Sequence, residues 1–208
     1  MMSEKIENPV KPRRGRPRNF DRELALTRAL DIFWLKGYEP ASIQELCVAM
    51  EINPPSLYAA FGNKAQLFLE SMRYYETKYW DHIWEKMVRE PDLYKAVNDF
   101  FLQAAKILTA PDLPCGCMVV LAAINVSANS QEVLDEVKKL RQEGRDCFLA
   151  RLEQGIQTGQ LPVGTDVEVL AYTFNTLLEG MSIQARDGLS QTALEGIGRA
   201  AMAILPKL

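Results

Sequence analysis

Histidine is almost absent from this chain, which has a single one, His82, among its 208 residues. The chain also lacks a glycine-rich phosphate loop, and one histidine leaves no obvious Ser-His-Asp or Cys-His arrangement. The sequence therefore predicts a protein that is not an enzyme and that carries no cofactor.

Cysteines and long apolar runs are scarce as well. Four cysteines in a chain of this length do not form a disulfide framework. The longest apolar run, residues 117–124, is far shorter than the roughly 20 residues that cross a bilayer. The polar, basic N-terminus shows no apolar core of a secretory signal. We therefore expect a protein of the reducing cytoplasm without a membrane partner.

Basic charge is in slight deficit overall, but it is concentrated at one end. The formal net charge is −3, whereas residues 1–20 carry six basic and two acidic side chains, a balance of +4. Residues 1–65 hold ten basic and eight acidic groups (+2), and the remaining residues hold 14 and 19 (−5). This asymmetry predicts an anionic partner at the N-terminal end only.

Helical periodicity is what the chain has in abundance, and no stretch shows convincing strand alternation. We predict an all-α protein with a disordered basic arm at 1–18, a small helical domain at 19–67 and a larger helical domain at 68–208. In the larger part we expect one long helix from residue 63 to about 89 and a short helix at about 117–128.

Two adjacent prolines, Pro54 and Pro55, lie where the surrounding sequence looks helical. Asn53 is a suitable N-cap, and prolines in the first turn of a helix remove no intrahelical hydrogen bond. Ser42 and Glu45 have the spacing of a capping box and open the preceding short helix. Two short helices joined by a brief turn and supported by a longer one predict a helix-turn-helix, whose second helix enters the major groove of DNA.

The basic arm supports the same interpretation. Arg14 and Arg16 lie in the sequence RGRP, and arginines of this kind suit the negative potential of a narrow minor groove. The alternative is a helical ligand-binding protein without DNA function. That alternative predicts that Arg14, Arg16, Tyr58 and Lys64 could be replaced without loss of function.

Residues 14–69 resemble the DNA-binding domain of the TetR family of transcriptional regulators. The matching elements are F-x-x-x-G-Y at the end of the first helix, then S-I-x-x-L, S-L-Y-x-x-F and x-K-x-x-L-F. The sequence GMSIQARDG at 180–188 and the PCGC loop at 114–117 are similar to one branch of this family. The resemblance implies a regulator, expected to be a repressor that a small-molecule effector releases from a palindromic operator.

The resemblance also implies roles for individual positions. Ser42, Tyr58 and Lys64 would contact phosphates of double-stranded DNA. Residues expected to face bases are Asn53, Pro54, Ser56, Ala59 and Ala60. Family members often have histidine or a longer polar residue where this chain has the two alanines. An alanine methyl group can contact a thymine methyl group but cannot donate a bidentate hydrogen bond, so we expect specificity to depend on DNA shape, the arm and water.

The larger domain would, by the same resemblance, receive the effector and pair with a second subunit through its last two long helices. Apolar stripes along both helices agree with a four-helix bundle across a two-fold axis, although part of each stripe must belong to the core. For the pocket we expect an apolar site with a few placed polar groups. Its predicted lining residues are Tyr75, Tyr79, Trp84, Met87, Phe101, Met118, Asn125 and Phe174.

Cys115 and Cys117 leave a second possibility open. A C-x-C pair can bind a soft metal or sense oxidation, which would make the protein a metal- or redox-responsive regulator of the same fold. Plain packing is also compatible with the pair, since free cysteine behaves as a small hydrophobic residue.

Overall fold

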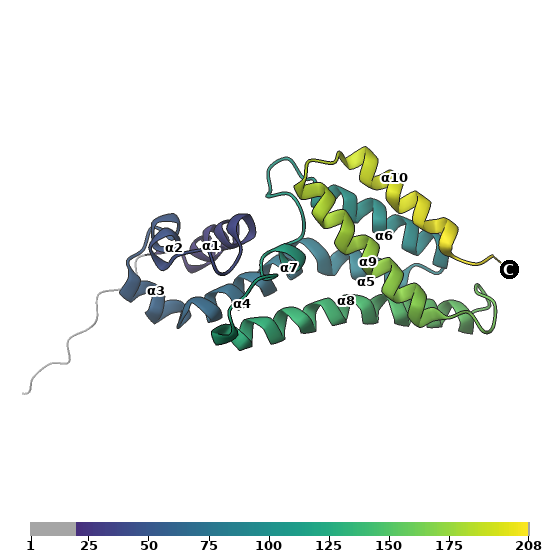
Figure 1. The fold of residues 1–208 in the computed structure, drawn as a ribbon, viewed down its shortest axis with the longest axis horizontal. Coiled ribbons are helices and arrows are strands. Elements are labelled where there is room, and N and C mark those ends of the chain that lie inside the picture. Colours follow the sequence, from purple (N-terminus) through teal and green to yellow (C-terminus); the bar gives the residue numbers. More distant parts are fainter. Residues whose placement is uncertain (1–19, 208) are drawn as a thin grey trace, which may run out of the picture.

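The computed structural model describes residues 20–207, which form helices joined by short connections, with no β-strand among them. The predicted all-α fold is therefore confirmed. Figure 1 shows a small group of helices at one end of the molecule and a larger bundle at the other, with α4 running between them. The helices are α1 (Arg22–Lys36), α2 (Ile43–Met50), α3 (Pro54–Phe61), α4 (Lys64–Tyr75), α5 (Asp81–Arg89), α6 (Leu93–Leu108), α7 (Met118–Leu121), α8 (Gln131–Gln157), α9 (Val167–Arg186) and α10 (Gln191–Ala201).

Local capping explains where the small helices begin. Asp21 accepts hydrogen bonds from two backbone N–H groups at the start of α1. Ser42 and Glu45 form a complete capping box at the start of α2. Asn53 accepts from the Ser56 N–H at 2.9 Å, and Pro54 follows as the first residue of α3. These side chains satisfy donors that a helix leaves without intrahelical partners.

Buried side chains from all four helices fill the small end. Leu57 and Phe61 of α3 are buried, and the Phe33 ring of α1 packs edge-on against Phe68 of α4, with ring centres 5.0 Å apart. At the surface, the Arg22 guanidinium binds the Glu70 carboxylate at 2.7 Å and lies over the Phe61 ring, 4.4 Å from its centre. The first helix is therefore fastened to both α3 and α4.

The long helix expected at 63–89 is present as a continuous helical run from Lys64 to Arg89, and it contains a wide turn that the sequence did not predict. The π-helical turn η1 (Glu76–Trp80) separates α4 from α5, and the Asp81 N–H donates to the Glu76 carbonyl five residues earlier. Inside this turn the Trp80 Nε1–H donates to the Tyr75 hydroxyl at 2.7 Å. Such turns are frequently found at functional sites.

The larger bundle surrounds a cluster of aromatic rings that belongs to one hydrophobic core running through the molecule. Phe100 and Phe101 of α6 meet Phe148 of α8 and Phe174 of α9, with ring centres 5.1–6.0 Å apart. Helix α10 covers α6 on the outer side (Figure 1). Burying this much aromatic surface accounts for much of the stability of the bundle.

The segment between α6 and α8 is less helical than predicted. Only Met118–Leu121 form α7, instead of a helix over about 117–128, and the short 3-10 turn η2 (Ala128–Ser130) precedes α8. The backbone here bonds to the turn that follows α1, because the Tyr38 N–H donates to the Ala122 carbonyl at 2.7 Å. A second 3-10 turn, η3 (Met202–Ile204), follows α10. Within residues 20–207, no helix has the length and apolarity needed to cross a membrane.

Candidate functional site

The exposed side of α3 forms the first candidate site. Leu57 and Phe61 face the core, so the helix presents Pro54, Tyr58 and Ala59 to solvent, and the Tyr58 ring is half exposed. Ser56 and Ala60 are partly buried beside them. Arg14 and Arg16 lie outside the described residues. The described part of the predicted DNA-binding set therefore lies on and beside one helix, and its role in binding remains a prediction.

Ser42 and Lys64, the predicted phosphate contacts beside α3, both have partners in the folded chain. The Ser42 hydroxyl donates to Glu45 within the capping box at 3.0 Å. The Lys64 ammonium donates to the Glu39 carbonyl at 3.1 Å and lies 4.5 Å from the centre of the Tyr38 ring. Burial lowers the pKa of Lys64, although the nearby charge of Glu39 favours the charged form. Both groups are thus held in place beside the helix.

A groove between α2 and α3 adds residues that sequence reasoning missed. Tyr58 and Pro54 form one wall of the groove, and Gln44 and Val48 of α2 form part of the other. Val48 is 74% exposed, although its neighbours Leu46 and Cys47 are buried. The exposed apolar side chain of Val48 on α2 is the feature of the sequence that could have indicated this surface.

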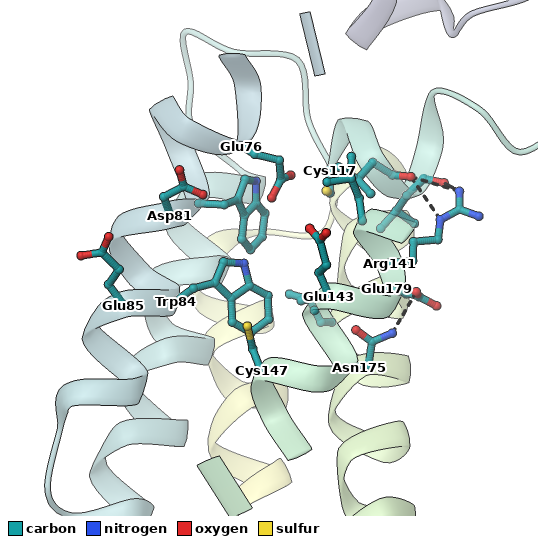
Figure 2. A pocket seen from close by; sticks show the side chains of 16 residues that line it. Glu76, Asp81, Trp84, Glu85, Cys117, Arg141, Glu143, Cys147, Asn175 and Glu179 are labelled. Atoms are coloured by element: carbon teal, nitrogen blue, oxygen red, sulfur yellow. Dashed lines mark hydrogen bonds between the residues drawn. The ribbon is translucent and has the colours of Figure 1, made fainter. Parts of the chain in front are cut away.

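A cavity in the larger bundle is the second candidate site. It has a volume of about 270 Å³ and lies between η1, α5, α7, α8 and α9. One part of its lining is aromatic or apolar: Trp80, Trp84, Val119, Val120, Leu140 and Leu178. The other part is polar or small: Glu76, Asp81, Glu85, Cys117, Arg141, Glu143, Gly144, Cys147, Asn175 and Glu179. Figure 2 shows these side chains around the space that they enclose.

The carboxyl groups give the cavity its electrostatic character. In Figure 2 the carboxyl groups of Glu76 and Glu143 point toward each other from opposite walls. Burial, followed by the charges of Asp81 and Glu143, raises the pKa of Glu76 to about 8. The Arg141 guanidinium is turned away and donates to the carbonyls of Val119 and Val120, each at 3.0 Å from Nη2. Its charge is thus held at the end of α7.

Cys117 lies on the cavity wall as a buried thiol. The Tyr75 hydroxyl hydrogen-bonds this thiol and accepts a hydrogen bond from Trp80. Burial and the charge of Glu76 raise the pKa of Cys117 to about 12. The reactive form of cysteine is the thiolate, so Cys117 is a poor nucleophile at neutral pH.

Only one of the eight predicted pocket residues, Trp84, lines this cavity. Met87, Phe101, Met118 and Phe174 are buried in the core. Tyr75 lies directly behind the cavity wall, Tyr79 packs against Trp34 on the side toward α1, and Asn125 is exposed. The polar lining of the cavity was missed, because charged residues at three- and four-residue spacing look like the solvated face of a helix.

The backbone conformation of the loop that carries Cys115 and Cys117 requires a glycine between them. Gly116 has φ +84°, and a Cβ atom there would lie 2.7 Å from the Ser182 carbonyl oxygen. Only glycine fits this position. Cys115 is exposed while Cys117 is buried, and within residues 20–207 no group of three or more His, Cys, Asp or Glu side chains could hold a metal ion.

The same loop joins the cavity to the small end of the molecule. The Trp34 Nε1–H of α1 donates to the Gly116 carbonyl at 2.8 Å, and the Cys117 N–H donates to the Ser182 hydroxyl at 2.7 Å. Arg186 of α9 donates both to the Cys115 carbonyl and to the Trp34 carbonyl, at 2.9 and 3.0 Å. Cys117, which lines the cavity, thus directly follows the residue that accepts the hydrogen bond from α1.

The two apolar stripes considered for dimerisation mostly face the chain's own core. Val133, Val137, Phe148 and Leu152 of α8 are buried, as are Leu170, Phe174, Leu178 and Met181 of α9. A different set of apolar side chains is exposed along α9: Val169, Tyr172 and Ile183. The spacing of these three residues places them on one side of the helix.

Family models match both ends of the chain. The family model described as bacterial regulatory proteins, tetR family, matches residues 25–71, and a tetracyclin repressor-like C-terminal domain matches residues 95–201. The HTH-type transcriptional repressor ComR of Escherichia coli is 33% identical over 200 residues, covering 96% of this chain and 95% of ComR. The E. coli repressor BdcR is 48% identical over 61 residues, 29% of this chain and 31% of BdcR.

A solved structure shows the same architecture. A cysteine mutant of the TetR family regulator CifR, in complex with a 26-base-pair double-stranded operator, is 38% identical and has a TM-score of 0.88. The match covers 92% of this chain and 100% of that one. With the helix-turn-helix at one end and a helical cavity at the other, the chain belongs to the TetR family and is a DNA-binding transcriptional regulator.

Proposed function

We propose that the protein is a homodimeric repressor that an effector, bound in the 270 Å³ cavity, releases from a palindromic operator. The observation that carries this proposal is the hydrogen-bonded loop between the cavity and α1, because it joins the candidate effector site to the candidate DNA-binding face. Such a regulator works in the cytoplasm, where bacterial DNA lies. In this proposal residues 19–67 form the DNA-binding domain, and residues 68–208 form the effector-binding and dimerisation domain.

Helix α3 is proposed to lie in the major groove. Its open side carries Pro54, Tyr58 and Ala59, and its N-terminal end is the part that meets base edges in a helix-turn-helix. Lys64 and Ser42 flank the helix and are placed to contact phosphates. Arg14 and Arg16 would follow the minor groove on either side of the site. The small side chains on α3 favour an operator that is recognised in part by its shape.

The dimer is proposed to form through the exposed side of α9. Val169, Tyr172 and Ile183 are each 46–57% exposed and would be buried against the same helix of a second subunit. A two-fold contact of this kind is self-complementary, and it sets the distance between the two recognition helices. Two half-sites one helical turn apart require such a dimer.

Release is proposed to follow from movement of two connected segments. The turn η1 contributes Glu76 and Trp80 to the cavity and continues directly into α4 of the DNA-binding end. The 115–117 loop contributes Cys117 to the cavity and its neighbouring carbonyl to Trp34. An effector that binds one arrangement of these segments more tightly shifts the population toward it.

Selection of DNA sites from a random pool tests the proposal. We expect purified protein to enrich a two-fold symmetric site at moderate salt. Tyr58→Ala and Lys64→Ala should weaken binding to that site, and the Lys64 change should reduce the salt dependence of the association constant by about one charge. Failure to enrich any symmetric site would contradict the proposal.

The metal- or redox-responsive alternative has weaker support. The pair Cys115–Cys117 has no third ligand in the described part of the chain, and Cys117 is a neutral, buried thiol. Measurement of copper(I) and zinc stoichiometry on the reduced protein decides it, because tight binding would favour that alternative.

A further inference from the structure

The cavity lining holds more acidic than basic side chains, although two of its carboxylates have basic partners outside the lining: Glu85 pairs with Arg89 and Glu143 with Lys139. Its lining includes five carboxyl groups, from Glu76, Asp81, Glu85, Glu143 and Glu179, against the single guanidinium of Arg141. That guanidinium already binds the carbonyls of α7. Anionic ligands would be repelled from this space, and cationic ones would be attracted.

Glu76 is one of the lining carboxyl groups for which the described part of the chain supplies no hydrogen-bond or ion-pair partner. Among residues 20–207, no hydrogen-bond donor or basic side chain contacts its carboxyl oxygens, although the surrounding walls remove most of its water. The groups that face it are themselves acidic or neutral: Asp81, Glu143, Cys117 and Tyr75. A carboxyl group that is largely removed from water and has no partner favours its neutral form, and a cation placed beside it would favour the charged form.

The remaining walls suit an apolar body. The indole rings of Trp80 and Trp84 line the side formed by η1 and α5, and Leu140 and Leu178 lie among the residues of α8 and α9. The Trp84 ring is fixed from behind by Phe100 and Phe148, with ring centres 4.2 and 5.2 Å away. Indole faces attract organic cations through their ring electrons.

Size and ligand chemistry narrow the choice further. About 270 Å³ lies just below the range of roughly 300–1,000 Å³ found for drug-sized ligands. A bare metal ion would need several close ligands, and within the part of the chain that the structure describes no such group of three exists.

We propose that the effector is a small organic cation, an amine or quaternary ammonium compound, whose charged nitrogen lies between Glu76 and Glu143 while its apolar part packs on Trp80 and Trp84. This inference rests on the proposed function, because it names the ligand class of the same cavity. A cation in this position removes the repulsion between the two carboxylates. It also pulls η1, which carries Glu76, toward α8, which carries Glu143.

Calorimetric titration of the full-length protein at pH 8.5 tests the inference with three probes of similar shape: benzyltrimethylammonium, benzyl alcohol and phenylacetate. We expect the cation to bind about tenfold or more tightly than the alcohol, and phenylacetate to bind most weakly. Glu76→Gln and Glu143→Gln should each weaken binding of the cation by about five- to tenfold and leave the alcohol unaffected. Glu153→Gln, an exposed acid on α8 away from the cavity, is the matched control and should change nothing.

Thermal unfolding of each variant shows whether it is folded. If the Glu76→Gln protein does not fold, the binding measured for the Glu143→Gln protein tests the inference. Equal affinity for all three probes, or no binding of the cation up to about 10 mM, would overturn the inference. The same probes are then added to the complex with the selected operator, which the cation should dissociate. If the protein binds the operator but not the cation, only the effector class is wrong. If it binds the cation but no DNA, the proposed function fails instead.

Discussion

The two ends of the molecule obtain their shapes in different ways. In the DNA-binding end each helix begins at a cap that lies next to it in sequence, such as Ser42 for α2 and Asn53 for α3. The effector cavity is made from five elements between residues 76 and 179, and no short stretch of sequence contains it. The first region is specified locally and the second by long-range packing, so substitutions should affect the two regions differently.

The largest effect is expected from the core of the DNA-binding end. Leu57→Ala removes a fully buried side chain of α3, and we expect the free energy of unfolding to fall by roughly 2–5 kcal/mol, with loss of operator binding. Tyr58→Ala, at the next position, is the control: the half-exposed ring should contribute little to stability, and its loss should weaken DNA binding only. Chemical denaturation and operator titration measure both. Equal destabilisation by the two changes would contradict the assignment of faces on α3.

The stability contributed by the cavity should depend on pH through Glu76, a residue that the DNA-binding end does not contain. The pKa of Glu76 is raised from 4.5 to about 8, so between these values the folded state holds a proton that the unfolded state has released. Stability should therefore fall as pH rises through this window. At about 1.4 kcal/mol per pKa unit the upper bound is roughly 5 kcal/mol, and water at the cavity mouth should reduce it to a few.

Glu76→Gln isolates this effect, because the difference between the two proteins cancels other titrating groups. The variant should be more stable than the unaltered protein at pH 8.5, and the two should converge near pH 5. Thermal unfolding across this range measures the difference. A constant difference at every pH would show that Glu76 ionises normally.

The link between the two regions should depend on one indole N–H. Trp34→Phe removes the donor to the Gly116 carbonyl and leaves that acceptor buried, which should cost about 1–3 kcal/mol. It should also reduce the effect of an effector on operator binding. Tyr94→Phe is the matched control, since it removes the hydrogen bond to the Pro206 carbonyl far from the loop. A loss of effector response in the control would argue against a specific path through Gly116.

The smallest effect is expected at the cap of the recognition helix. Asn53→Ala should lower stability by about 1 kcal/mol, because the Ser56 N–H loses its acceptor. Asn53→Asp retains an acceptor and should restore stability, but its charge should weaken operator binding by repulsion from phosphate. If the Asn53→Asp variant and the unaltered protein bind the operator equally well, this residue lies away from DNA.

Sequence reasoning was most successful where structure depends on near neighbours. The fold class, the family and the caps at Ser42 and Asn53 could all be predicted, since each depends on residues within a few positions. The cavity could not be predicted in the same way. Glu76, Glu143 and Glu179 look like solvated helix surface in sequence, and only the packing of α8 and α9 against η1 brings them to the walls of one cavity. Aromatic residues such as Phe101 and Phe174 suggested a pocket, yet they form the core behind it.

The π-helical turn has a consequence for the cavity wall. A π turn completes one turn with one residue more than an α-helical turn, so the extra residue is absorbed with little rotation of the helices on either side. Deletion of one residue from Glu76–Trp80 would therefore join α4 and α5 into a regular helix and leave the DNA-binding end in nearly the same orientation. The side chains that this turn presents to the cavity, Glu76 and Trp80, would change position. The extra residue of this single turn thus belongs to the shape of the cavity and not to the direction of the recognition helix.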